Sequence, residues 1–246
     1  MPRRALPALA LCFFVSGLGS LALEVVWTRQ MRLVFGSTTL AASTILVAYM
    51  LGLGLGGLLG GRLSRRAHTA GDGVRLYGWM EIGIGLYALA VPAAFAWFPT
   101  LNRAWLYTLG FWEAALARFL IALAVLLVPT ILMGATLPVL VAALTRRDPR
   151  VGRSTALLYG LNTLGAVAGV FVATFVLLGW LGLRGTSLFG AGLDALVGVI
   201  ALVFVAPLVG RRAAGEAAAD SEPAAAPVAL AEAAPSPRAL VVLLVS

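Results

Sequence analysis

The sequence predicts an all-α integral membrane protein of about six transmembrane helices. Hydrophobic residues make up 61% of the chain and charged residues 11%, and the mean hydropathy is +0.99. Soluble domains carry about a quarter charged residues. The apolar residues fall in runs of roughly 20, the length at which an α-helix crosses a hydrocarbon core of about 30 Å. The alternating ten-residue segments typical of a membrane β-barrel do not occur along the chain.

The apolar runs divide the chain into three regions. The predicted helices cover about 5–27, 38–63, 76–98, 119–144, 155–178 and 183–208, so residues 1–210 form a transmembrane domain. Residues 211–237 are rich in Ala, Pro and acidic residues and predict a flexible cytoplasmic linker. Residues 238–246 begin a further apolar run, which we expect to be the truncated start of a seventh helix and of a second helical repeat.

The arginines predict how these helices are oriented. All 18 basic residues are Arg, and they lie between the apolar runs instead of on one face, which argues against nucleic acid as a partner. If the N-terminus is cytoplasmic, 13 of the 18 lie on the cytoplasmic side, as the positive-inside rule requires. Five of the six tryptophans, Trp27 among them, then lie near the opposite interface. We expect a multi-pass protein of the bacterial inner (plasma) membrane with a cytoplasmic N-terminus.

A run of glycines in the second predicted helix has two interpretations. Gly52, Gly54 and Gly57 spell G-x-G-x-x-G, which forms a dinucleotide loop only within a soluble βαβ unit, and no such unit surrounds it. Gly52, Gly56 and Gly60 recur every four residues, a spacing that lets transmembrane helices approach closely. We therefore predict a helix-packing face, and no cofactor, metal site or catalytic residue in this chain.

Acidic residues at membrane depth are the strongest indication of a site. An ionised group near the bilayer centre costs about 2.5–3.5 kcal/mol on insertion scales. Glu24, Glu81 and Asp194 occupy such positions, although for Glu81 and Asp194 a place near an interface, or a role in capping a neighbouring helix, is the better explanation. The predicted substrate or ion site comprises Glu24, Trp27, Arg29, Asn162 and Asp194.

Two features of this site leave alternatives open. Glu24 either has a functional role or forms a structural ion pair with Arg29 or Arg32. Pro129 and Pro138 predict that the helix between them is kinked or locally unwound, as in transporter sites, but prolines also occur in ordinary spanning helices.

Two segments resemble a known family. They are 16–66, with its E-V-V-W-x-R and F-G-S-T blocks, and 129–169, with its P-T-x-L-M-G-A-T-L-P and L-Y-G-x-N-T-x-G-A blocks. Both resemble the membrane region of bacterial fused spermidine synthase-like proteins, although Leu23 stands where that family often has Tyr. The resemblance implies helices like half of a major facilitator transporter, joined to a soluble aminopropyltransferase-like domain. Residues 56–66 also resemble a cytoplasmic loop of major facilitator transporters.

Three functions follow as hypotheses. The first is a membrane module that handles a polyamine-like product, with the lipid bilayer and a downstream soluble synthase-like domain as partners. In that case the aminopropyltransferase activity belongs to a domain that this sequence does not contain. The second is the N-terminal half of a major facilitator-type secondary transporter, which needs a second helical repeat. The third is a membrane anchor or scaffold that transports nothing.

Overall fold

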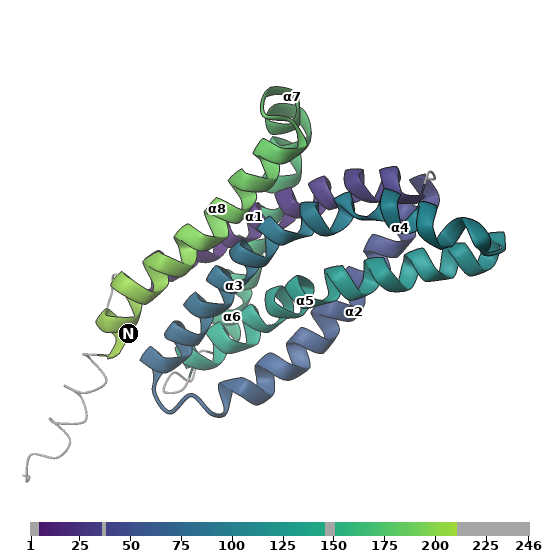
Figure 1. Cartoon of the computed structure of the whole chain (residues 1–246). Helices are drawn as coiled ribbons and strands as arrows, with labels where there is room; N and C mark the ends of the chain where they lie inside the picture. The colour runs from purple at the N-terminus through teal and green to yellow at the C-terminus, as the bar shows by residue number, and fades with distance from the viewer. Residues whose placement is uncertain (1–4, 36–37, 146–150, 211–246) are drawn as a thin grey trace, which may run out of the picture. The chain divides into compact units, whose positions relative to one another are not determined.

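The computed structural model describes residues 5–35, 38–145 and 151–210, which are helical and contain no β-strand (Figure 1). Within these residues, six helices are long and apolar enough to cross a membrane, namely Leu6–Phe35, Thr39–Ser64, Ala70–Ala104, Phe111–Leu144, Gly152–Trp180 and Gly182–Gly210. The predicted all-α membrane fold is confirmed. The predicted linker at 211–237 and the predicted helix start at 238–246 lie outside the described residues.

Several helices extend beyond their apolar runs. The helices are α1 (Ala5–Phe35), α2 (Thr38–Ser64), α3 (Ala70–Ala96), α4 (Phe98–Ala104), α5 (Phe111–Thr145), α6 (Val151–Val172), α7 (Leu178–Trp180) and α8 (Gly182–Ile200). We predicted ends at 27 for the first helix and starts at 76 and 119 for the third and fourth, and these three boundaries are wrong. Hydropathy detects only the hydrocarbon core, whereas the helices continue into interfacial layers that bring the total to about 40–45 Å.

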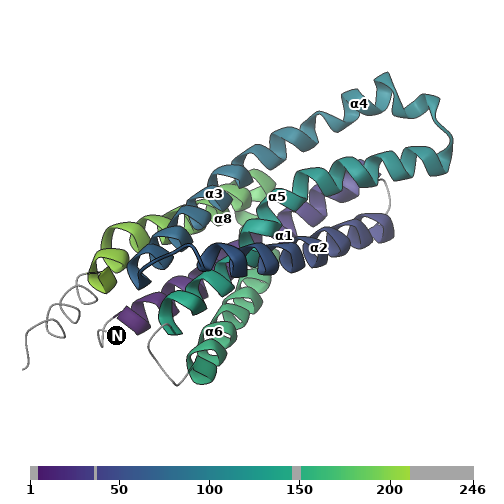
Figure 2. The same cartoon turned by 90° about the horizontal axis from the view of Figure 1, so that it is seen from below.

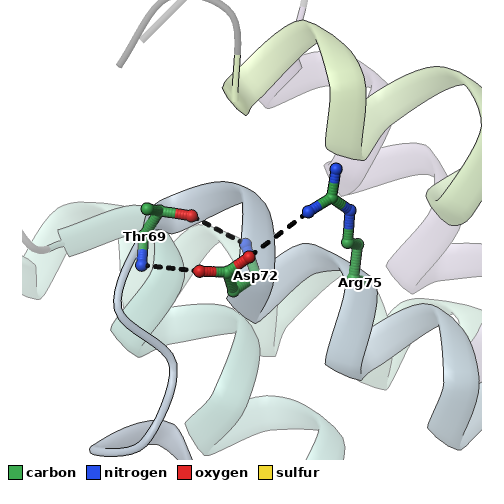
Figure 3. Close-up of polar contacts among 3 residues, drawn as sticks. All are labelled: Thr69, Asp72 and Arg75. Carbon is green, nitrogen blue, oxygen red and sulfur yellow. Dashed lines mark hydrogen bonds and ion pairs between the residues drawn. The ribbon is translucent and has the colours of Figure 1, made fainter. Parts of the chain in front are cut away.

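The start of α3 shows what sets such a boundary (Figure 3). Thr69 Oγ1 accepts a hydrogen bond from the backbone N–H of Asp72 at 3.1 Å, and the Asp72 carboxylate accepts one from the backbone N–H of Thr69 at 3.0 Å. Arg75 then pairs with the same carboxylate at 3.3 Å. This reciprocal capping box satisfies two backbone donors that would otherwise lack partners, so α3 begins at Ala70, six residues before the apolar run.

The helices pack in pairs around α1, α3 and α5 (Figures 1 and 2). The most extensive contact joins α2 to α5, followed by α1 with α6, and α3 lies against both α5 and α8. One hydrophobic core surrounds Phe13 and Tyr77, whose rings meet edge to face with centroids 6.0 Å apart. A second core surrounds Trp27 and Tyr49, at 6.4 Å. Helices α1, α3, α5 and α8 all contribute to both cores, and α1 is the most deeply buried of the six spans, so it is the central element of the bundle.

The predicted glycine face of α2 lies against α5. Gly52 meets Thr130, and Gly56 meets Gly134 and Ala135 so closely that an added Cβ would lie 2.9 Å from backbone atoms of both. Gly60 also contacts Ala135. The G-x-G-x-x-G sequence lies wholly inside α2, with no loop that could surround a phosphate.

The prolines of α5 do not unwind it. The helix is continuous from Phe111 to Thr145, so local unwinding between Pro129 and Pro138 is wrong. Pro129 lacks the backbone N–H that would otherwise donate a hydrogen bond to the carbonyl of Val125. The hydroxyl of Tyr87 in α3 donates a hydrogen bond to that carbonyl instead, at 3.1 Å. Departures from α geometry occur as π-helical turns at Ala173–Leu177 and Ala201–Val205, which the sequence did not predict.

Candidate functional site: a buried acidic cluster

Two carboxyl groups from different helices meet the same turn of α1. Glu81 of α3 and Asp194 of α8 are both 0% exposed. Ser16 donates its hydroxyl to Glu81 Oε1 at 2.8 Å. Gly19, three residues further along α1, lies against the other carboxyl, and a Cβ there would lie 2.5 Å from Asp194 Oδ1. Because Gly19 has no side chain, Asp194 is able to approach the α1 backbone directly.

Most oxygens of this pair have no hydrogen-bond partner. Glu81 Oε2 and both carboxylate oxygens of Asp194 are buried and unpartnered in the described part of the chain. No Arg or His side chain that the structure describes forms an ion pair with either residue. Burying an ionised carboxylate without a partner is strongly unfavourable, so these oxygens are suited to a bound proton or another cation.

Hydroxyl groups complete what we call the acidic cluster, defined as Ser16, Tyr49, Tyr77, Glu81 and Asp194. The phenol of Tyr77 is buried beside Ser16 and Glu81. Tyr49 of α2 is 5% exposed, its hydroxyl has no hydrogen-bond partner, and it lies within electrostatic reach of Glu24 and Asp194. A phenolic hydroxyl both donates and accepts, so Tyr49 is able to assist a carboxylate or a bound cation.

The cluster lies far from the helix ends. Glu81 is eleven residues after Ala70 and Asp194 is twelve after Gly182. At 1.5 Å per residue, these offsets correspond to about 16 Å and 18 Å along the helix axes. Both carboxyl groups therefore lie about three turns inside their helices, away from the helix ends.

The predicted site residues are only partly brought together. Tyr49 lies within electrostatic reach of both Glu24 and Asp194, but no hydrogen bond joins it to either acid. Asn162 of α6 instead packs on Gly17, where a Cβ would lie 2.8 Å from its Oδ1. Gly17 and Gly19 are about 200° apart around α1, so Asn162 faces away from the acidic cluster.

Glu24 and its neighbours differ from the expected arrangement. No ion pair joins Glu24 to Arg29 or Arg32, although the structure describes all three. Trp27, expected at the outer interface, is 0% exposed and packs on Tyr49 because α1 is central in the bundle. The other tryptophans of that group are well exposed, namely Trp97, Trp105, Trp112 and Trp180.

The predicted site left out four residues of the cluster, namely Ser16, Tyr49, Tyr77 and Glu81. Glu81 had a signal, since it is an acid within an apolar run, but hydropathy begins that run at 76, which predicts a place for Glu81 close to a helix end. The three hydroxyl residues had none, because a single hydroxyl in a spanning helix is common. No group of three or more His, Cys, Asp or Glu side chains in the described ranges is arranged to hold a metal ion.

Comparisons with known proteins identify no relative of this chain. No family model matches the chain, and no curated protein or solved structure matches it either. The resemblance to spermidine synthase-like fusions therefore stays a prediction that rests on the sequence blocks.

Proposed function

We propose that this chain is the membrane module of a spermidine synthase-like fused protein, and that its acidic cluster binds a polyamine-like cation inside the membrane. The supporting observation is the group of three buried carboxylate oxygens without partners on Glu81 and Asp194. A protonated amine supplies the missing donors, since an ammonium group has three N–H bonds and no acceptor. Its charge also offsets the cost of holding carboxylates at membrane depth.

The tight packing of α1 limits how an amine reaches this cluster. Gly19 and Gly190 place the backbones of α1 and α8 in close contact beside Asp194. An amine needs α1 and α8 to separate before it enters. Movement of one group of helices against another around a midplane site is how secondary transporters alternate access.

The same packing favours a second candidate, the half of a proton-coupled secondary transporter. A proton is the one cation that the closed cluster accommodates without any movement of α1. In this candidate Glu81 and Asp194 carry the coupling proton, and the substrate binds where a second helical repeat completes the site.

Uptake of labelled spermidine into proteoliposomes containing the full-length gene product tests the two candidates. Saturable uptake or binding without a pH gradient is the expected result for the amine-handling module. Uptake that requires an inward proton gradient indicates the secondary transporter. The absence of both binding and uptake would contradict the proposal and favour a scaffold.

We also propose that the membrane is the bacterial inner membrane and that the N-terminus is cytoplasmic. Single cysteines at positions 66, 103 and 147 report this orientation, with the one native cysteine, the buried Cys12, replaced by Ala. An impermeant thiol reagent added to intact cells is expected to label position 103 alone. Labelling at 66 or 147 with none at 103 would reverse the orientation.

A further inference from the structure

A cavity lies at one end of the bundle, apart from the acidic cluster. Its volume is about 680 Å³, within the range of about 300–1,000 Å³ typical of small-molecule sites. The C-terminal parts of α1 and α3, helix α4, and the beginnings of α5 and α8 form its walls. None of the five members of the acidic cluster lines it.

The polar groups of this cavity carry positive charge. Arg118 and Arg184 line it, and no Asp or Glu does. Arg118 donates to Asn102 Oδ1 at 2.7 Å, which holds its guanidinium at the wall, and Arg184 forms no ion pair with any described residue. Two arginines without a carboxylate partner favour an oxyanion, which guanidinium groups bind through paired N–H bonds.

The start of α8 adds to this charge. Gly182 and Leu183 line the cavity, and the capping residue Leu181 supplies no side-chain acceptor to the first turn. The first N–H groups of a helix have no partner within the helix, and they carry about half a positive charge between them. Together with Arg184, this end of α8 strengthens the attraction for an anion.

The remaining walls are apolar. Phe95 and Phe98 are 5% and 4% exposed, and their ring centroids lie 5.9 Å apart. Leu33 and Pro92 line the same cavity. Gln30 also lines the cavity, and its side-chain oxygen is buried without a hydrogen-bond partner.

We propose that this cavity binds an amphiphile with an anionic oxyanion head, the head directed to Arg118 and Arg184 and the apolar body to Phe95 and Phe98. A membrane phospholipid and a free anionic amphiphile share this chemistry. The site does not depend on the function of the acidic cluster, so either proposal is able to fail without the other.

Binding to the purified chain in nonionic detergent, measured by native mass spectrometry, tests the site. The probes are phosphatidylglycerol, neutral-headed phosphatidylcholine and dodecyl phosphate. The expected result is binding of at least one anionic probe with at least tenfold preference over phosphatidylcholine. Binding of phosphatidylglycerol alone assigns the site to lipid, whereas dodecyl phosphate that displaces it assigns the site to free amphiphiles.

Three variants connect the binding to the cavity. Arg118→Gln with Arg184→Gln is expected to weaken anionic binding at least tenfold. Arg184→Gln alone changes an exposed side chain without an ion pair, so folding is retained, and about a threefold loss is expected from one lost charge. Arg103→Gln is the matched control, because Arg103 is exposed on α4 and does not line the cavity. Equal binding of all three probes, or an equal loss in Arg103→Gln, would overturn the proposal.

Discussion

Replacing Gly56 by Leu is expected to separate α2 from α5 and to destabilise the protein by about 1–3 kcal/mol or more. An added Cβ at this position already lies 2.9 Å from the backbone nitrogen of Ala135 and from Cα of Gly134. Both are backbone atoms, so no side-chain rotation relieves the clash, and Leu adds three further carbons. Thermal unfolding in detergent, followed by circular dichroism, should show a lower melting temperature and a reduced yield of folded protein.

Gly54→Leu is the matched control on the same helix. Gly54 is exposed, and a Cβ there meets no atom within 4 Å, so the added leucine faces outward. Both variants gain the same helix propensity, about 0.8–1.0 kcal/mol for replacing glycine inside a helix. Gly54→Leu should therefore unfold at or above the temperature of the unmodified protein. An unchanged melting profile for Gly56→Leu would show that this face is not an interface that the fold requires.

The glycine face illustrates what local sequence is able to predict. A repeat of small residues every four positions fixes which side of a helix allows close approach, whatever the partner is. The partner itself, Thr130 to Ala135 of α5, follows from how the helices are arranged in three dimensions. Nothing in α2 alone distinguishes α5 from another helix.

Helix length explains why Glu81 was underestimated. Hydropathy begins the third span at 76, where Glu81 lies within two turns of the end, but the capping box at Thr69 begins it at Ala70. Those six residues shift Glu81 about 9 Å further from the helix end. The T-A-G-D sequence matches a capping box, so capping signals indicate this helix start where hydropathy alone does not.

The pairing of Glu81 with Asp194 could not be predicted in the same way. They are on different helices, 113 positions apart in the sequence, and come together because α3 packs directly on α8 and both helices also contact α1. Gly19 makes that meeting possible by leaving space for Asp194, and a single glycine in an apolar run gives no sign of this role. Packing between helices that are distant in the sequence therefore brings the two acids together, whereas the sequence around each acid predicts only its depth in the membrane.

Asp194→Asn and Glu81→Gln are each expected to weaken binding of the polyamine-like cation at least tenfold, which corresponds to about 1.4 kcal/mol. Each change keeps the shape of the side chain and removes its charge. Glutamine at 81 is still able to accept the hydrogen bond from Ser16. Since a charge at mid-depth costs about 2.5–3.5 kcal/mol on insertion scales, the folded yield should stay equal or rise. Spermidine binding and membrane yield are measured on the same preparations.

Glu113→Gln is the control for a general effect of negative charge. Glu113 is exposed at the start of α5, where it accepts a hydrogen bond from the backbone N–H of Gly110 at 3.0 Å, and glutamine is able to accept the same bond. Its binding of spermidine should equal that of the unmodified chain. A low folded yield of Glu81→Gln or Asp194→Asn, together with lost binding, would assign these acids to structure instead of cation binding.

The double variant, Glu81→Gln with Asp194→Asn, separates a shared cation from two independent effects. If one cation contacts both carboxylates, either single change removes most of its stabilisation, and the second change adds little. The two losses are then strongly non-additive, as expected for residues that act on one partner. If each acid acts alone, the losses in binding free energy add to within about 0.3–0.5 kcal/mol. Undiminished binding in the double variant would exclude the acidic cluster as the cation site.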